Sequence, residues 1–368
     1  MTTGAGQSKL KRIAVIADLL EERWPSMDLA AEQLASGLSR LTDTESLLVR
    51  PPLRVARGGA GPSMSARAFG RFVQLPIELA ARRPAVDFFH IADHSYGHLA
   101  LLFPSQRVGI YCHDIDAYRA LLPGSGAPRP RVLLSQLLLK GLRHAGVVFH
   151  STSSVREEIL HHDLVPESRL VRAPLGIAAE FLDVEAESAA QPPYLLHVGA
   201  CTPRKNIALL LQVFAAIRQK RPELGLVQIG GPFNDAQRSF IEQHGLASHI
   251  VQRQGISRQE LARAYAGATA VLVPSLAEGF GLPVIEALAC GAPVIASDIP
   301  VLREVGFEGV RFCALTDVGS WLRAIDEACA PGARPKIDAR DRVRARYSWH
   351  AHAQIVARAY TDAGGVHG

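Results

Sequence analysis

Short apolar runs alternate with stretches of helical periodicity from one end of the chain to the other. Runs that are apolar at nearly every position are typical of parallel strands covered on both faces, and their alternation with helices predicts an α/β fold. The candidate strands are RIAVIAD, SLLV, VDFFHIAD, RVGIYCHD, GVVFHS and LVRAPL in the first half, and YLLHVGA, LGLVQIG, HIVQRQG, AVLVPS, PVIASD and VRFCA in the second. We therefore expect two doubly wound parallel sheets, one in each half.

A linker separates the two series of strands. The segment DVEAESAAQPP at residues 183–193 is acidic, rich in small residues and ends in proline, which is typical of a domain boundary. We predict a first domain at residues 1–187 and a second at 188–345. Residues 346–368 are helical after the second sheet has ended, and we expect this helix to cross back to the first domain.

Helix starts are readable at two positions. Ser154 with Glu157, and Ser257 with Glu260, match the capping-box pattern. In that pattern a serine hydroxyl and a glutamate three residues later satisfy N–H groups that the first turn leaves without partners. We expect a helix to begin at each of these two places.

Composition limits the class of protein. A length of 368 residues is enough for two domains, and 48% hydrophobic with 20% charged residues is typical of a soluble globular protein. No apolar run approaches the roughly 18 residues needed to span a bilayer, and the N-terminal KLKRIAVIADLLEER fits a first strand better than a signal peptide.

The cysteines are odd in number and lack C-x-x-C spacing, which favours a reducing cytoplasm over a disulfide framework or zinc site: Cys112, Cys201, Cys290, Cys313 and Cys329.

The net charge of +5 comes mostly from arginine. Residues 50–83 are the most basic stretch, and residues 130–144 combine leucines with basic side chains. Both stretches have two interpretations: an ordinary solvated or core-packed helix with a basic rim, which we favour for residues 50–83, or a patch for anionic lipid headgroups or a phosphate-bearing acceptor. The arginines of the first stretch are Arg50, Arg54, Arg57, Arg67, Arg71, Arg82 and Arg83.

Two carboxylates flank a glycine-rich loop in the segment PSLAEGFGLPVIEALAC. Glu278 follows the strand AVLVPS, and ligands of parallel sheets bind beyond the carboxyl ends of strands. Gly279 and Gly281 allow the backbone to approach a ligand, and Glu286 lies in the helix that follows. Carboxylates accept hydrogen bonds from sugar hydroxyls and helix N-termini attract phosphate, which together indicate a nucleotide sugar. The alternative is a solvated Glu278 and a Glu286 that only favours the helix dipole.

A second segment, YLLHVGACTPRKN, places Arg204 and Lys205 at the mouth of an amphipathic helix. Cations are electrostatically unfavourable at a helix N-terminus unless an anion lies there. A diphosphate would fit, with Lys205 as a point charge and Arg204 as a forked donor. The alternative is a solvated basic turn.

These segments resemble the retaining glycosyltransferases of family 4. The resemblance rests on VGACTPRKN, on the E-x7-E motif EGFGLPVIE, on GAPVIASDIPVLREV and, in the first half, on YCHDIDAYRALL. It implies the GT-B fold, with two facing Rossmann-like domains and an active site in the cleft between them. It also implies a nucleotide-diphospho-sugar donor, of which GDP-mannose is favoured, and no bound metal or other cofactor.

The resemblance also implies roles for particular residues. Glu278 would contact the donor sugar, Glu286 the ribose, and His113 the transferred sugar from the first domain, with Asp114 beside it. The donor-binding set would be Arg204, Lys205, Glu278, Gly279, Phe280, Gly281, Leu282 and Glu286, and the catalytic set His113, Asp114, Glu278 and Lys205.

The chain departs from the family pattern in two places. Ala200 stands where many members carry a second arginine for the diphosphate, which leaves Arg204, Lys205 and backbone N–H groups to hold it. The segment LLEERWPSM replaces a Gly-Gly loop after the first strand, which puts acceptor contacts around Trp24 in doubt. We expect the acceptor side to include Trp24, His94, Ser95 and Tyr96.

Two further patterns have the form of metal-binding motifs, but their context argues against metal binding. Asp114-Ile-Asp116 has the form of a DxD motif, but it ends a first-domain strand where the family uses its histidine. His90, His94 and His98 would align only on a helix, whereas FFHIAD is strand-like and Gly97 interrupts the spacing. We expect a strand end followed by a loop instead.

The sequence thus predicts a cytoplasmic hexosyltransferase of bacterial surface polysaccharide or lipopolysaccharide synthesis. Its expected partners are a nucleotide-sugar donor and a glycan or lipid-linked acceptor, with peripheral contact to the inner membrane and no nucleic acid. Two alternatives stay open: a non-catalytic nucleotide-sugar-binding subunit, and a transferase with a small soluble acceptor such as a sugar phosphate.

Overall fold

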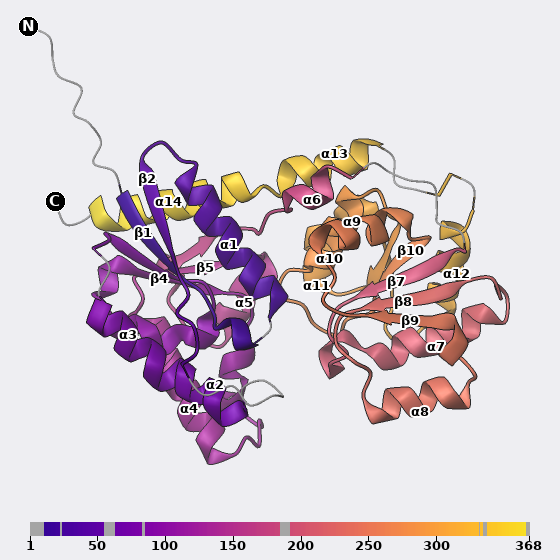
Figure 1. Ribbon diagram of the computed structural model, residues 1–368, viewed down its shortest axis with the longest axis horizontal. Helices are drawn as coiled ribbons and strands as arrows, with labels where there is room; N and C mark the ends of the chain where they lie inside the picture. Colours follow the sequence, from indigo (N-terminus) through magenta and orange to yellow (C-terminus); the bar gives the residue numbers. More distant parts are fainter. Residues whose placement is uncertain are drawn as a thin grey trace, which may run out of the picture. The chain divides into compact units, whose positions relative to one another are not determined.

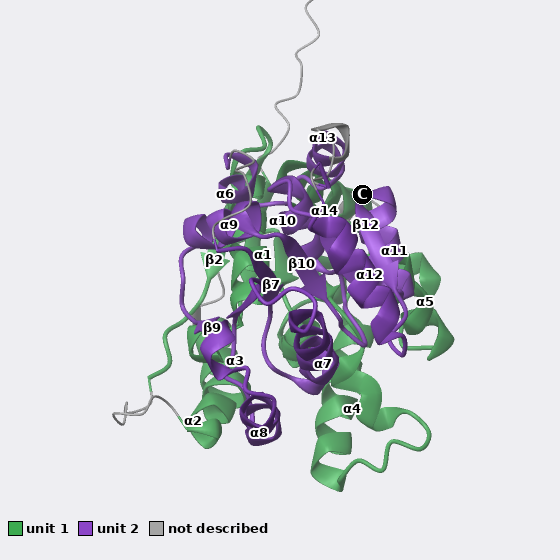
Figure 2. Ribbon diagram, turned by 90° about the vertical axis from the view of Figure 1, so that its right-hand side faces the viewer, with its two compact units in different colours: residues 1–176, 349–368 green, residues 177–348 purple. Residues whose placement is uncertain are grey.

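The computed structural model describes residues 11–22, 24–54, 63–82, 85–184, 192–330, 332–333 and 337–365. The chain divides into two compact units, unit 1 at residues 1–176 with 349–368, and unit 2 at residues 177–348 (Figure 2). Each unit contains a six-stranded parallel sheet. The predicted α/β class, with two Rossmann-like domains, is confirmed.

Unit 1 is built on a sheet of order β2-β1-β3-β4-β5-β6 (Figure 1). Its strands are β1 Lys11–Ile16, β2 Thr44–Val49, β3 Phe88–Ile91, β4 Val108–Cys112, β5 Val147–His150 and β6 Leu170–Arg172. Its α-helices are α1 Pro25–Ser39, α2 Met64–Phe69, α3 Leu75–Arg82, α4 Arg129–His144, α5 Ser153–His161 and α14 Trp349–Gly365. Shorter helical turns are η1 Leu20–Glu22, η2 Gly70–Gln74, η3 His94–Leu102, η4 Ser105–Arg107, η5 Asp116–Leu121 and η6 Glu167–Arg169.

Unit 2 repeats the plan with a sheet of order β12-β11-β10-β7-β8-β9. Its strands are β7 Tyr194–Val198, β8 Gly225–Ile229, β9 Ile250–Arg253, β10 Ala270–Val273, β11 Val294–Ser297 and β12 Val310–Cys313. Its α-helices are α6 Ala179–Leu182, α7 Ile207–Arg218, α8 Asp235–Gln243, α9 Arg258–Gly267, α10 Leu282–Ala289, α11 Pro300–Gly306, α12 Val318–Ala328 and α13 Ile337–Arg346. Shorter turns are η7 Pro203–Lys205, η8 Ala247–His249 and η9 Phe307–Gly309.

All the predicted strands are present, and buried strands such as β4, β5, β10 and β11 leave an unbroken apolar signal. The Ser257–Glu260 capping box before α9 is confirmed. The Ser154–Glu157 box is wrong: the N-cap of α5 is Thr152, whose hydroxyl accepts from the Val155 N–H at 3.2 Å. Ser154 is the second residue of α5, and Thr152, directly before the helix, caps it.

The units divide at residues 176/177 and 348/349, whereas the sequence placed the boundaries at 187/188 and 345/346. The difference arises because α6 packs inside unit 2. The Phe181 ring meets Tyr265 at 5.9 Å between centroids, and the Cys290 thiol donates to the Phe181 carbonyl. Most of the predicted linker, residues 185–191, lies outside the described residues.

Helix α14 belongs to the core of unit 1. Its buried Tyr360 donates to the Phe89 carbonyl at 3.3 Å and lies 3.0 Å from His90 Nδ1, which ties the end of the chain to β3. Among the described helices, none has both the length and the apolar character needed to cross a bilayer.

Candidate active site

The loops that follow β7 and β10 meet at one edge of the unit 2 sheet. The two strands pair in parallel, with Leu196 opposite Val271, so both chains leave the sheet at its carboxyl edge. The Leu276 N–H then donates to the Arg204 carbonyl at 2.8 Å, which joins the loop carrying Lys205 to the loop carrying Glu278. The two sequence segments that predicted a donor site are therefore neighbours.

Lys205 and Glu278 form a buried ion pair. Lys205 Nζ lies 2.5 Å from Glu278 Oε1, which also accepts from the Ser275 hydroxyl at 2.7 Å. Burial opposes ionisation of Glu278, but Lys205, Ser275 and Arg204 outweigh it and lower the pKa of this carboxyl. From the sequence we expected a bound diphosphate to balance the charge of Lys205. In the structure the carboxylate of Glu278 balances it. The interpretation of Glu278 as a solvated loop acid is excluded, since its side chain is 5% exposed.

Gly281 shapes the entry to α10. It adopts φ 93°, which L side chains rarely tolerate, and a Cβ on it would lie 2.8 Å from Leu302 Cδ2. Phe280 is buried against Tyr347, with 5.5 Å between ring centroids, while Leu282 begins the helix. Gly279 to Leu282 thus form a fixed turn whose following helix presents its N-terminus at the carboxyl edge of the sheet.

Glu286 is the fifth residue of α10. It is 6% exposed and accepts from the Tyr265 hydroxyl at 3.0 Å through Oε2. Burial raises the pKa of Glu286 to about 7, against the lowering effects of the Tyr265 hydrogen bond and the Arg258 charge. A helix-dipole role does not require such burial, so this carboxyl is better placed to receive a ligand.

His113 and His94 lie together at the carboxyl ends of β4 and β3 in unit 1. His113 Nε2 lies 2.8 Å from the Ala92 carbonyl and so carries the proton, and the His113 backbone N–H donates to His94 Nδ1 at 3.3 Å. His94 Nε2 faces Asp114 Oδ1 at 3.4 Å. The sequence-predicted catalytic pair His113 and Asp114 is therefore joined through His94.

The histidines differ in charge because their surroundings differ. Burial lowers the pKa of His113, which keeps its imidazole neutral. Burial acts in the same direction on His94, but the hydrogen bond to Asp114 and the charge of Asp93 outweigh it and raise the pKa of His94. His94 thus lies between the carboxylates of Asp93 and Asp114.

Of the predicted acceptor-side residues, Ser95 and Tyr96 belong to the same hydrogen-bonded cluster as His94, whereas Trp24 does not. Ser95 donates from both its N–H and its hydroxyl to Asp93, each at 2.8 Å. Tyr96 is buried, accepts from the Leu19 N–H at 3.1 Å and lies under the Arg71 guanidinium at 4.2 Å. Within the described residues, Trp24 takes no part in this network and stands 45% exposed at the start of α1.

Asp18 is a member of this cluster that sequence reasoning missed. The β1–β3 register sets Ile16 opposite Ile91, which brings Asp18 and Asp93 to equivalent places. Burial raises the pKa of Asp18 to about 9, helped by the Asp93 and Glu22 carboxylates, so Asp18 keeps its proton at neutral pH. The repeated triplet I-A-D at the ends of both strands is the signal that would have found it.

The residues of the weaker metal patterns are engaged elsewhere. Asp116 Oδ1 accepts from Arg119 Nε at 2.6 Å, His90 contacts Tyr360, and His98 Nε2 faces the Arg71 carbonyl at 3.1 Å. In the part of the chain that the structure describes, no three acidic, histidine or cysteine side chains are placed to hold a metal ion.

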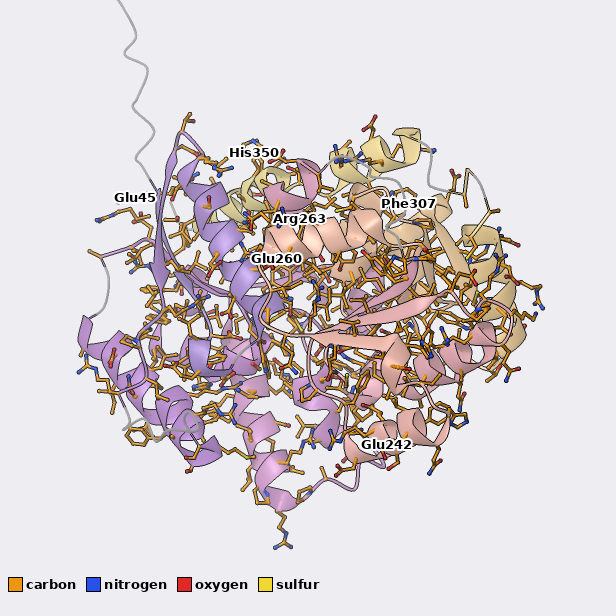
Figure 3. All side chains as sticks on the ribbon, turned by 45° about the vertical axis from the view of Figure 1, so that its right-hand side comes forward. Glu45, Glu242, Glu260, Arg263, Phe307 and His350 are labelled. Atoms are coloured by element: carbon orange, nitrogen blue, oxygen red, sulfur yellow. The ribbon has the colours of Figure 1, made fainter. Side chains whose placement is uncertain are left out.

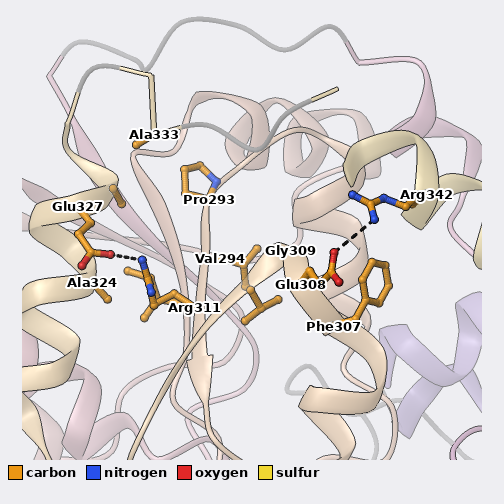
Figure 4. A pocket seen from close by; sticks show the side chains of 13 residues that line it. Pro293, Val294, Phe307, Glu308, Gly309, Arg311, Ala324, Glu327, Ala333 and Arg342 are labelled. Carbon is orange, nitrogen blue, oxygen red and sulfur yellow. Dashed lines mark hydrogen bonds and ion pairs between the residues drawn. The ribbon is translucent and has the colours of Figure 1, made fainter. Parts of the chain in front are cut away.

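A cavity of about 630 Å³ lies away from this chemistry, at the amino ends of β11 and β12. Figure 4 shows Arg311 directed at Glu327 and Arg342 directed at Glu308 across it, with 3.3 Å between the atoms of the second pair. Ligands of parallel sheets bind at the carboxyl ends, and these charges already pair with one another. The candidate ligand site therefore stays at Lys205 and Glu278, outside this cavity.

Comparisons with known proteins identify the family to which unit 2 is similar. The family model described as "Glycosyl transferases group 1" matches residues 179–336, nearly all of unit 2. The chain is 28% identical over 257 residues to O-antigen chain mannosyltransferase B of Escherichia coli, covering 65% of this chain and 67% of that one. It is 33% identical over 183 residues to a D-inositol 3-phosphate glycosyltransferase of Frankia alni, covering 46% of this chain and 45% of that one, less than half of its length.

Among solved structures, a sucrose-phosphate synthase from Thermosynechococcus elongatus superimposes with a TM-score of 0.74 at 19% identity, over 97% of this chain and 100% of that one. At that identity the likeness shows the fold alone. Residues 179–336, which carry Lys205 and the E-x7-E loop, thus match a glycosyl transferases group 1 domain, and the fold shared over the whole length is GT-B.

Proposed function

We propose that the protein is a retaining, metal-independent hexosyltransferase that uses a nucleoside-diphosphate sugar. The buried Lys205–Glu278 pair at the carboxyl edge of the unit 2 sheet carries this proposal, because it sets a cation and a hydroxyl acceptor side by side. Mannose, supplied as GDP-mannose, is our proposed sugar, since the Escherichia coli relative is named as a mannosyltransferase.

The main catalytic contribution is electrostatic. Cleavage of the sugar–diphosphate bond leaves extra negative charge on the departing nucleotide, and preorganised positive charge stabilises it. Lys205, Arg204 and the N-terminus of α10 supply that charge from the protein itself. Ala200 is exposed and adds none, which makes Lys205 the principal cation.

The carboxylates serve binding and not a covalent intermediate. Lys205 and Ser275 hold Glu278, and Tyr265 holds Glu286. Each carboxylate is therefore fixed by its own hydrogen-bond partners and has a separate binding role. In our proposal Glu278 accepts hydroxyls of the donor sugar, Glu286 accepts the ribose, and the acceptor attacks the face from which the nucleotide leaves. His113 offers a neutral imidazole to the sugar, with Asp114 held beside it by His94.

Calorimetric titration of GDP, UDP and dTDP, followed by transfer from GDP-mannose, tests the proposal. We expect one nucleotide to bind at micromolar level and transfer to persist in excess EDTA. Binding without transfer would favour the non-catalytic alternative, no binding of any of the three would contradict the proposal, and loss of transfer in EDTA would contradict metal independence.

The acceptor is our second proposal within this function: a glycan or lipid-linked glycan. The name of the Escherichia coli relative supports a glycan, whereas the Frankia alni relative is named for inositol 3-phosphate and supports the soluble alternative. The carboxylates Asp93, Asp114 and Glu22 at the unit 1 strand ends disfavour a phosphate there. Transfer to lipid-linked oligosaccharide and to inositol 3-phosphate, assayed in parallel, decides between them.

We also propose that α4 brings unit 1 to the inner face of the membrane. Leu138 and Leu142 bury one side of α4, while Leu133 and Leu137 stand 65% and 40% exposed on the other. Lys140 is exposed one turn beyond Leu137 and can meet anionic headgroups. A core-packed helix alone does not require an exposed leucine face.

The double variant Leu133→Ser and Leu137→Ser is expected to lose binding to anionic vesicles in low salt without losing nucleotide affinity. Flotation on a density gradient measures vesicle binding, and Val251→Ser, at a 50% exposed position on β9, is the matched control. Equal flotation of wild type and the double variant, or none by wild type, would contradict the proposal.

A further inference from the structure

His197 is a buried histidine on β7 that the functions described so far do not use. Its side chain is 1% exposed, two residues before Gly199 in the segment that carries Lys205. Nδ1 lies 3.1 Å from the Leu272 carbonyl. A carbonyl only accepts hydrogen bonds, so Nδ1 carries the proton and Nε2 presents a lone pair.

The lone pair of Nε2 has no partner although the atom is buried. Buried polar atoms in folded proteins are nearly always hydrogen-bonded, so an unsatisfied one at a ligand site points to a partner that arrives later. Burial lowers the pKa of His197 to about 4, and the nearby Lys205 charge acts in the same direction. The imidazole is thus a neutral acceptor at every physiological pH.

Nε2 and the side chain of Lys205 lie next to the same glycine. A Cβ built on Gly199 would lie 3.6 Å from His197 Nε2 and 3.2 Å from Lys205 Cε. Gly199 has φ 153°, and any larger residue would fill the space between the two side chains. The chain keeps that space open.

We propose that His197 is a positioning residue for Lys205, whose ammonium donates to His197 Nε2 when a nucleoside diphosphate occupies the donor site. An ammonium has three N–H donors. In the structure one of them serves Glu278, and in the bound state a second serves the diphosphate and the third serves His197. The inference rests on the proposed function, because it requires the diphosphate at Lys205.

Two substitutions separate this role from the structural bond to Leu272. His197→Asn places an amide N–H where Nδ1 stands and provides no acceptor at Nε2, whereas His197→Gln places an acceptor at Nε2. We expect His197→Asn to weaken binding of the nucleotide that wild type prefers by about tenfold, as for a lost hydrogen bond to a charged group. We expect His197→Gln to recover most of that loss, with thermal unfolding of His197→Asn close to wild type.

Nitrogen NMR of ¹⁵N-histidine-labelled protein gives a readout that a structural role would not move. The Nε2 resonance of His197 should shift when GDP, UDP or dTDP, whichever binds wild type, is added, and the shift should vanish in Lys205→Met at a nucleotide concentration that saturates this variant. An unchanged resonance in nucleotide-bound wild type, a shift that persists in Lys205→Met, or wild-type affinity in His197→Asn would overturn the inference alone. Failure of wild type to bind any of the three nucleotides would overturn the proposed function, and this inference with it.

Discussion

Lys205→Met is expected to weaken nucleoside diphosphate binding by tenfold or more and to lower kcat/KM for sugar transfer by about 10²–10³. The substitution keeps most of the length of the side chain and removes its charge. The larger effect falls on transfer because the diphosphate gains negative charge as the bond to the sugar breaks. Calorimetry measures the first effect, and initial rates with GDP-mannose measure the second.

Loss of binding must be distinguished from loss of folding, because Lys205→Met also leaves Glu278 buried without its cation. Breaking one partner of a buried pair costs about 3–5 kcal/mol of unfolding free energy. The double variant Lys205→Met with Glu278→Gln removes that charge and should regain stability but neither binding nor transfer. Lys220→Met, at an exposed position after α7, should behave as wild type. Nucleotide affinity in the double variant equal to that of wild type would show that Lys205 does not hold the diphosphate.

The fold was predictable from the sequence because strands buried on both faces leave a local signal. Each strand and the helix after it are continuous in the chain, so no long-range pairing had to be known. Local signals failed where several residues offered the same chemistry. In the run STSS at residues 151–154, Thr152 and Ser154 offer the same capping chemistry, and the helix begins one residue after Thr152.

The sequence identified site residues that lie in one contiguous motif. It did not identify the residues that contact them from other parts of the chain. Glu278 and Glu286 were identified from one loop, but their partners Lys205 and Tyr265 lie far away in sequence and follow from strand order. Asp18 beside Asp93 required the β1–β3 pairing in the same way. Parallel sheets bring strand ends together in an order that local periodicity does not encode.

Glu286→Gln is expected to stabilise unit 2 at pH 8 and to weaken nucleotide binding in the same sample. The folded protein raises the pKa of Glu286 from 4.5 to about 7, so the folded state holds this proton more tightly than the unfolded chain. The contribution of Glu286 to the free energy of unfolding is therefore fully present below pH 4.5 and is lost as the pH rises through 7. The loss amounts to about 3 kcal/mol above that pH, and the neutral glutamine does not incur it.

The difference in melting temperature between Glu286→Gln and wild type should thus be near zero at pH 4.5 and reach several degrees at pH 8. Glu242→Gln, on the surface of α8 (Figure 3), is the control and should show no such trend. A carboxylate accepts two ribose hydroxyls where an amide oxygen accepts more weakly, so affinity at pH 8 should fall about tenfold in the same variant. A variant that gained stability and kept full affinity would show that the burial of Glu286 does not serve the nucleotide.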